Sequence, residues 1–216
     1  SIDPANLSVS VQAGVVLMDL QAALAAKKLF FPPDPSSGEY ATFGGMCNTN
    51  ASGAHSVKYG NVADYFLDAE VVLPDGAVHT LSQVASMPAA RLPENLRQLA
   101  ALYQENADVI ESAYPPIACN VAGYNLRGLV ADHRLRLHRL LAGAEGTLAV
   151  VTRLKFRLIP KPAADALVVA YFDDIGQAAK AVQLTMPLGP SGIEIMDKSL
   201  LGLARASDAT LQERIP

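Results

Sequence analysis

Apolar and polar residues alternate with a period of two over 7–11 and 148–158, a pattern typical of strands with one buried face. The apolar run 66–73 is also predicted to be a strand. Pro74, Asp75 and Gly76 follow it, and this composition predicts a tight turn because proline presets φ and glycine accepts the left-handed conformation. The chain then returns over 78–81, so we expect a β-hairpin.

Helical spacing of apolar residues predicts helices over 16–26 and 93–107. The first is expected to end at Lys27 and Lys28, where cations complement the helix dipole. A helical turn is also expected over 124–130. The prolines and phenylalanines of 30–35 predict an extended loop between the first helix and the next segment.

The pattern changes after Pro160 and Pro162, where we place a domain boundary. The first domain is predicted to cover 1–161 and the second 162–216. Beyond the boundary the chain predicts strand, helix, strand and helix in turn. These elements are expected at 167–171, 175–184, 193–196 and 198–204. Four elements bury little area, so the second domain is expected to be truncated.

Composition narrows the class of protein. The 216 residues are 50% hydrophobic and 18% charged, which permits a folded core. The net charge of −4 disfavours a nucleic-acid-binding protein. No apolar run is long enough to span a membrane and no signal peptide is recognised. Cys47 and Cys119 are far apart and are expected to be reduced thiols, which favours a cytoplasmic protein.

The stretch 42–64 differs from the rest of the chain because glycine and short polar residues dominate it. Glycine lets backbone approach a ligand closely and leaves N–H groups that can face an anion. We therefore expect a surface here that suits a long, flat, polar cofactor. The glycines are Gly44, Gly45, Gly53 and Gly60, and the short polar residues include Thr42, Asn48, Thr49, Asn50 and Ser52.

Seven motifs in order carry a family resemblance over about residues 5–205. They read VQAG, FFPPDP, ATFGGMCNTNASG, KYGNVADY, EVVLPDG, GYNLRGL and GAEGTLAVVTRLKFRLIPKP. The chain resembles the FAD-linked oxidases with a flavin domain of the vanillyl-alcohol-oxidase (PCMH) type, and especially the D-2-hydroxyacid dehydrogenases, such as D-lactate dehydrogenase and the catalytic subunit of glycolate oxidase. The segment between GYNL and GAEGTL is similar to large members that carry an iron–sulfur domain.

The resemblance implies an α+β fold: the second subdomain of a PCMH-type domain, with a mixed, mainly antiparallel sheet and helices, followed by the start of a ferredoxin-like cap. It also implies that FAD is the cofactor, held by four groups of residues. The backbone between Thr42 and Gly60, joined by the Glu145 corner, is then expected to line one wall of a trough for the dinucleotide. No catalytic residue and no metal ligand is assigned. The implied contacts are Pro33, Asp34 and Pro35; Thr42, Gly44, Gly45, Asn48, Thr49, Asn50, Ser52 and Gly53; Tyr59, Gly60 and Asp64; and Glu145, Gly146 and Val150.

Two family features are missing from these 216 residues: the Arg-Gly-x-Gly-Thr loop that grips the pyrophosphate, and the His-rich segment of the cap. The chain is therefore expected to be a fragment with weak FAD binding and no turnover of its own. For the parent protein the resemblance implies oxidation of a lactate- or glycolate-like D-2-hydroxyacid to the 2-oxoacid, with an electron acceptor or partner subunit. A non-catalytic flavin-domain module that docks a partner is the alternative. A reductase of cell-wall sugar precursors is a third hypothesis, disfavoured by the sequence after Lys161.

Several side chains allow a structural or a functional interpretation. His55 contacts either a ligand or the loop backbone, and Lys58 either neutralises a phosphate or covers surface. Glu145 either caps a turn or contacts the cofactor, and Tyr124 with Asn125 either faces the substrate or packs internally. The remaining histidines, His79, His133 and His138, lack metal-ligand spacing. The basic residues Arg134, Arg136, Arg139, Arg153, Lys155 and Arg157 form either a solvated face or a docking surface.

Overall fold

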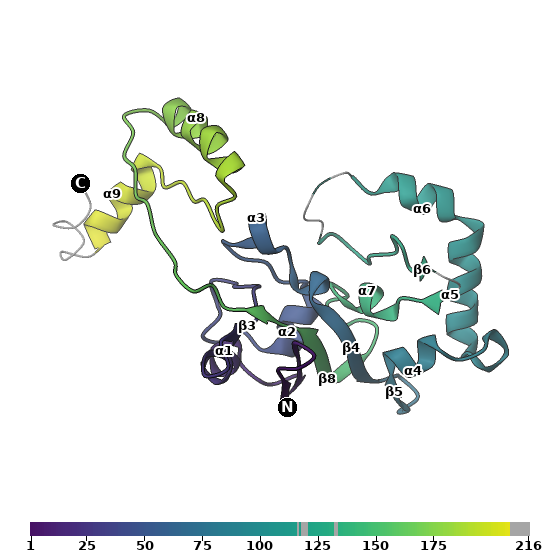
Figure 1. The fold of residues 1–216 in the computed structure, drawn as a ribbon. Helices are drawn as coiled ribbons and strands as arrows, with labels where there is room; N and C mark the ends of the chain where they lie inside the picture. Colours follow the sequence, from purple (N-terminus) through teal and green to yellow (C-terminus); the bar gives the residue numbers. More distant parts are fainter. Residues whose placement is uncertain (116, 118–120, 132–133, 208–216) are drawn as a thin grey trace. The chain divides into compact units, whose positions relative to one another are not determined.

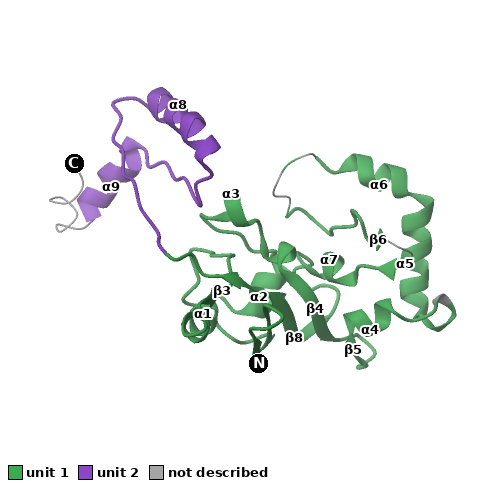
Figure 2. Ribbon diagram, viewed as in Figure 1, with its two compact units in different colours: residues 1–163 green, residues 164–216 purple. Residues whose placement is uncertain are grey.

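The computed structural model describes residues 1–115, 117, 121–131 and 134–207. It has two compact units, residues 1–163 and 164–216, which are described separately below (Figure 2). The first unit is an α+β structure built on a mainly antiparallel sheet, as the sequence predicts.

Five antiparallel strands form the main sheet of the first unit, in the order β1-β2-β8-β4-β5 (Figure 1). The first and last stretches of this unit lie side by side, because Val9 pairs with Phe156 and Val11 with Leu154. The predicted hairpin is confirmed: β4 pairs with β5, and Gly76 has the expected positive φ of 82°. The strands are β1 (Ile2–Asp3), β2 (Ser8–Gln12), β4 (Phe66–Val72), β5 (Val78–Thr80) and β8 (Val150–Arg157).

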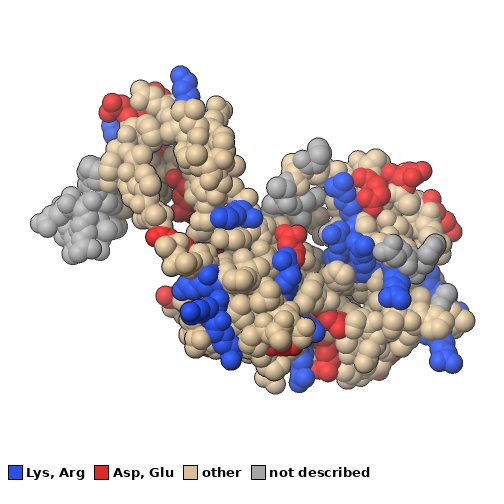
Figure 3. Space-filling view, in the orientation of Figure 1, with Lys and Arg blue, Asp and Glu red and all other residues tan. Residues whose placement is uncertain are grey.

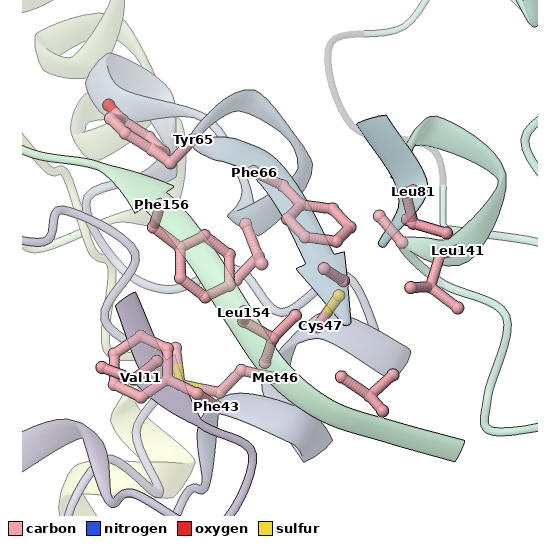
Figure 4. Close-up of a cluster of buried hydrophobic side chains, with 14 of the residues drawn as sticks. Val11, Phe43, Met46, Cys47, Tyr65, Phe66, Leu81, Leu141, Leu154 and Phe156 are labelled. Carbon is pink, nitrogen blue, oxygen red and sulfur yellow. The ribbon is translucent and has the colours of Figure 1, made fainter. Parts of the chain in front are cut away.

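Aromatic rings fill the centre of the core on one face of this sheet (Figure 4). Phe31, Phe43 and Phe156 are fully buried, and their ring centroids lie 5.1–5.4 Å apart. Two helices pack here. Helix α2 (Phe43–Asn48) contributes Phe43, Met46 and Cys47, and α1 (Leu17–Ala25) contributes Leu17, Leu20 and Leu24 at the spacing of one helical face. The predicted first helix is thus confirmed.

Shorter elements complete the first unit. Two small antiparallel pairs join β3 (Leu29–Phe30) to β9 (Ile159–Pro160) and β6 (Val130–Ala131) to β7 (Arg134–Leu135). The helix predicted over 93–107 is present as α5. The helical turn predicted over 124–130 does not form: 127–128 make a turn and Val130 begins β6. The other helices are α3 (Ser56–Tyr59), η1 (Val62–Asp64), α4 (Leu81–Ala85), η2 (Ala89–Arg91), α5 (Glu94–Glu105), α6 (Ala107–Ala113) and α7 (Leu137–Leu141).

The second unit contains helices but no strand among its described residues, 164–207. Helices α8 (Ile175–Thr185) and α9 (Lys198–Ser207) occur where the sequence predicts them, with η3 (Met186–Leu188) after α8. Asp174 caps α8 by accepting a hydrogen bond from Gly176 N at 2.7 Å. The strands predicted at 167–171 and 193–196 do not form. A helix satisfies its own backbone groups, whereas a strand needs a neighbour.

Charged side chains of both signs are interspersed on the visible face of the first unit (Figure 3). Among the described helices, none combines the length and the apolar composition that crossing a membrane requires.

Candidate functional site

The glycine-rich segment begins with a helix that the sequence did not predict. Thr42 is the N-cap of α2, and its Oγ1 accepts a hydrogen bond from Gly45 N at 3.3 Å. Gly44 N donates to Ala13 O at 2.8 Å, and a Cβ at Gly44 would lie 2.9 Å from that of Ala13. Gly44 therefore serves close packing within the chain, and its N–H is engaged by Ala13 O instead of being open to a ligand.

Asn48 joins this segment to the corner at Glu145 and Gly146, and Gly146 lies 98 residues further along the chain. Its backbone oxygen accepts from Glu145 N at 2.8 Å, and its Oδ1 accepts from Gly146 N at 3.2 Å. Its Nδ2 donates to Gly44 O at 2.9 Å. A further bond runs from Gly143 N to Cys47 O at 2.9 Å. The two segments expected to form the trough wall are therefore adjacent.

The corner itself has an unusual backbone and is tied to a tyrosine. Glu145 is exposed and has φ 52°, and Gly146 follows with φ 74°. The hydroxyls of Thr147 and Tyr124 lie 2.7 Å apart. Tyr114 supports this contact, because its hydroxyl donates to Tyr124 O at 2.7 Å. The sequence does not predict this role of Tyr114, because nothing local signals a partner ten residues away.

The Pro-Asp-Pro loop contacts the second half of the glycine-rich segment through Asp34. The Asp34 carboxylate accepts hydrogen bonds from His55 N, at 3.3 Å, and from His55 Nδ1. The sequence suggested either a ligand or the loop backbone as the partner of His55, and neither interpretation included a carboxylate. Gly53 packs directly against Asp34, so two loops that carry implied cofactor contacts are held together here.

Three further predicted residues have clear roles inside the fold. Asn50 is 7% exposed with φ 46°, and its Oδ1 accepts from Ala63 N at 2.9 Å. The Asp64 carboxylate accepts from Asn61 N at 2.8 Å in a capping box. The same carboxylate lies so close to Gly60, which has φ 75°, that a Cβ on that residue would collide with it. These contacts position the segment, while a role in binding stays a prediction.

The remaining predicted residues lie around this surface or at its margin. Tyr59 packs edge-on against Phe30 at 5.7 Å, and Lys58 Nζ lies 5.6 Å from the centroid of the Tyr59 ring. Val150 is 67% exposed and pairs with Val72 on the sheet. Of the other predicted contacts, Pro33 is fully buried and Pro35 is half-buried. The Thr49 hydroxyl donates to Gly45 O at 3.1 Å.

Some backbone donors in the segment remain open. Ser52, Ala54 and Val57 are exposed, and their N–H groups make no hydrogen bond within the part of the chain that the structure describes. Gly146 is also exposed, and nothing lies within 4 Å of the position of its missing Cβ. Open N–H groups and a bare backbone suit a polar, anionic group, so these residues fit a dinucleotide such as FAD on one side.

Nucleophilic chemistry is disfavoured at the buried thiol. Burial raises the pKa of Cys47 to about 12, so its thiol stays protonated at neutral pH. Within the described residues no group of three or more His, Cys, Asp or Glu side chains is arranged to hold a metal ion. Cys119 and His133 lie outside the described residues.

Two cavities of the first unit lie elsewhere. The larger, of about 490 Å³, is lined by Asp68, Ser82, Arg134, Arg136 and His138 among others. Burial lowers the pKa of His138, as do Arg139 and Arg136, against an opposing effect of Asp68. A smaller cavity, of about 150 Å³, borders the first at Ala85, Arg134 and Leu135. None of the residues with implied FAD contacts lines either cavity.

Comparison with known proteins gives this surface a context. Residues 1–82 match the family of FAD binding domains. The chain is 32% identical to glycolate oxidase subunit GlcD of Bacillus subtilis over 93% of its own length and 34% of that protein. It is 35% identical to a D-2-hydroxyglutarate dehydrogenase of Pseudomonas putida, over 91% of the chain and 20% of that protein. With a D-lactate dehydrogenase of Anaerostipes hadrus the identity is 28%, over 92% and 33%.

The chain thus spans a fifth to a third of the length of these relatives. The matches confirm the resemblance inferred from the ordered motifs. They identify the chain as a homologue of 2-hydroxyacid dehydrogenases and oxidases, with an FAD binding domain match over residues 1–82.

Proposed function

We propose that the protein to which these residues belong is an FAD-dependent dehydrogenase that oxidises a D-2-hydroxyacid, lactate-like or glycolate-like, to the 2-oxoacid. The observation that carries the proposal is the junction of 47–50 with 143–146, which adjoins a segment with open N–H groups. The names of the relatives, which specify glycolate, D-2-hydroxyglutarate and D-lactate, support a 2-hydroxyacid as the substrate class.

In this proposal the residues of the chain bind and shield the cofactor. The exposed N–H groups of Ser52, Ala54 and Val57 would donate to its polar oxygens. Asn48 would hold the Glu145 corner in place beside them. When bound, FAD supplies a two-electron acceptor for the hydride that leaves the substrate Cα.

Oxidation of the alcohol also releases the hydroxyl proton, so a base is required. We assign none among the described residues of this chain. We place the base, the substrate carboxylate site and the electron acceptor or partner subunit in other parts of the whole protein. The domain assignment is part of the same proposal: residues 1–161 in the flavin domain and 162–216 in a ferredoxin-like cap.

An absorbance experiment on the purified full-length protein tests the proposal. We expect flavin bands that bleach anaerobically on addition of D-lactate or glycolate and persist with L-lactate. D-2-Hydroxyglutarate is tested as a third substrate. If it alone bleaches the flavin, the proposed reaction class holds and the proposed substrate is wrong. A colourless protein that takes up no added FAD would overturn the proposal and favour the non-catalytic docking module.

A further inference from the structure

Asp34 and His55 form a link between two loops that lie 21 residues apart in the sequence. The Asp34 carboxylate receives two donors from one residue: Oδ1 from the His55 backbone N–H at 3.3 Å, and Oδ2 from the ring Nδ1. The two side chains are 34% and 46% exposed respectively, so the contact lies at the surface of the first unit.

Close packing beside this contact fixes the carboxylate. A Cβ at Gly53 would lie 2.1 Å from Asp34 O and 2.3 Å from its Oδ1, so only glycine permits this approach. A tight turn follows, because Gly53 N donates to Ser56 Oγ at 2.8 Å and Ser56 N donates to Gly53 O at 3.0 Å. The carboxylate is therefore held at the base of the turn that ends in His55 and Ser56.

This link has no substitute nearby. Within the described residues, the hydrogen bonds between loop 33–35 and segment 52–57 are the two from His55 to Asp34. The open N–H groups of Ser52, Ala54 and Val57 flank His55 in this segment, Val57 within helix α3. A change in the link would therefore shift the donors proposed to face the cofactor.

We propose that Asp34 and His55 are a positioning pair for the cofactor: they clasp the Pro-Asp-Pro loop to the glycine-rich loop and so fix the direction of the N–H groups at 52–57. The inference rests on the proposed FAD site. Nδ1 donates to the carboxylate, which fixes the ring orientation and, in the neutral ring, leaves the proton on Nδ1. A side chain with one correctly placed N–H should therefore replace the ring.

The test compares His55→Ala, His55→Asn and Asp34→Asn with the wild type in the full-length protein. The amide of asparagine can donate from nearly the same place as Nδ1, whereas alanine cannot. His79→Ala is the matched control, because His79 lies on β5, apart from both loops. The dissociation constant of FAD is measured by flavin fluorescence on the apoprotein, together with the flavin spectrum and the thermal midpoint of the apoprotein.

We expect FAD to bind about tenfold more weakly to His55→Ala, because the substitution removes one charge-assisted hydrogen bond of the link. His55→Asn should restore binding to within about threefold, and Asp34→Asn should fall between them. The double variant Asp34→Asn/His55→Ala should bind no more weakly than His55→Ala, because both changes break the same link. The control should bind as the wild type does.

Unchanged FAD affinity in His55→Ala, with only a lower thermal midpoint of the apoprotein, would reduce the pair to a stabilising contact and overturn the inference. Equal weakening in His55→Asn and His55→Ala would also overturn it, because the donor would then not matter. A wild-type protein that binds no FAD contradicts the proposed function instead, so the two failures are distinguishable.

Discussion

At the scale of single residues, the glycines of 42–64 are used chiefly to let the chain approach itself. Gly44 meets Ala13, Gly53 meets Asp34 and Gly60 meets Asp64. The sequence indicates that backbone comes close to something in this segment, since glycine removes the Cβ. It does not indicate what approaches, because the partners lie up to 31 residues away in the chain or in another loop.

Gly53→Ala is the sharpest stability test of this view. Its Cβ would overlap both the backbone oxygen and the carboxylate of Asp34, and backbone cannot move aside as a side-chain end can. We expect the free energy of unfolding to fall by about 2–4 kcal/mol, measured by urea denaturation. Gly14→Ala is the control, because nothing lies within 4 Å of its Cβ position and its change should stay within about 0.5 kcal/mol. Equal effects of the two variants would contradict the argument.

His138 should make stability depend on pH. Burial, with Arg139 and Arg136 nearby, lowers its pKa below the ordinary value of 6.5, while Asp68 opposes this. Just below pH 6.5 the unfolded chain therefore binds more protons than the folded one, and stability falls as the pH drops through that value toward the folded-state pKa. Urea midpoints between pH 8 and pH 5 measure the fall, and His138→Gln should reduce it. The same pH dependence in the variant would show that His138 is not its source.

At the scale of elements, the sheet is far more predictable than the site. Strands β2, β4, β5 and β8 and the hairpin turn follow from alternation and turn composition, which are local signals. Helix α2 was missed because two glycines in six residues argue against a helix, yet Thr42 caps it and Phe43, Met46 and Cys47 bury its apolar face. Tertiary packing outweighs propensity there.

Residues of the site that depend on contacts between elements were harder to predict. The implied position of Asn48 beside the cofactor came from a motif. Its side chain bonds Gly44 O within α2 and Gly146 N at a corner 98 residues away. Neither these bonds nor the link from Asp34 to His55 leaves a periodic signal. Residue types could therefore be predicted for this surface, but not their partners.

Asn48→Ala tests the junction between α2 and the corner. The substitution removes the acceptor of Gly146 N and the donor to Gly44 O, while the backbone bond from Glu145 N to Asn48 O can remain. We expect a loss of about 1–3 kcal/mol in unfolding free energy and faster amide exchange at Gly146. Thr49→Ala is the neighbouring control, since within the described residues its hydroxyl bonds to Gly45 O alone, one helical turn away. Unchanged exchange at Gly146 in Asn48→Ala would contradict the role given to the side chain.

At the scale of the whole molecule, the distribution of buried side chains separates the two units. Every buried residue of the core lies at or before Leu158, while none of the described residues in 164–207 is buried. Leu167 and Val168, in the first predicted strand of the second unit, are 88% and 87% exposed. Apolar burial drives folding, so the stability of the chain should reside in the first unit.

Truncation after Ala163 should therefore leave the thermal midpoint of the first unit unchanged to within about 2 °C, because none of the described residues in 164–207 is buried and the buried core lies at or before Leu158. Calorimetry of residues 1–163 and 1–216 makes the comparison. The matched control is a chain that ends at Leu148. It lacks β8, and with it Leu154 and Phe156 of the core, so its cooperative transition should be abolished. A midpoint several degrees lower in 1–163 than in 1–216 would mean that residues 164–216 contribute to the stability of the first unit.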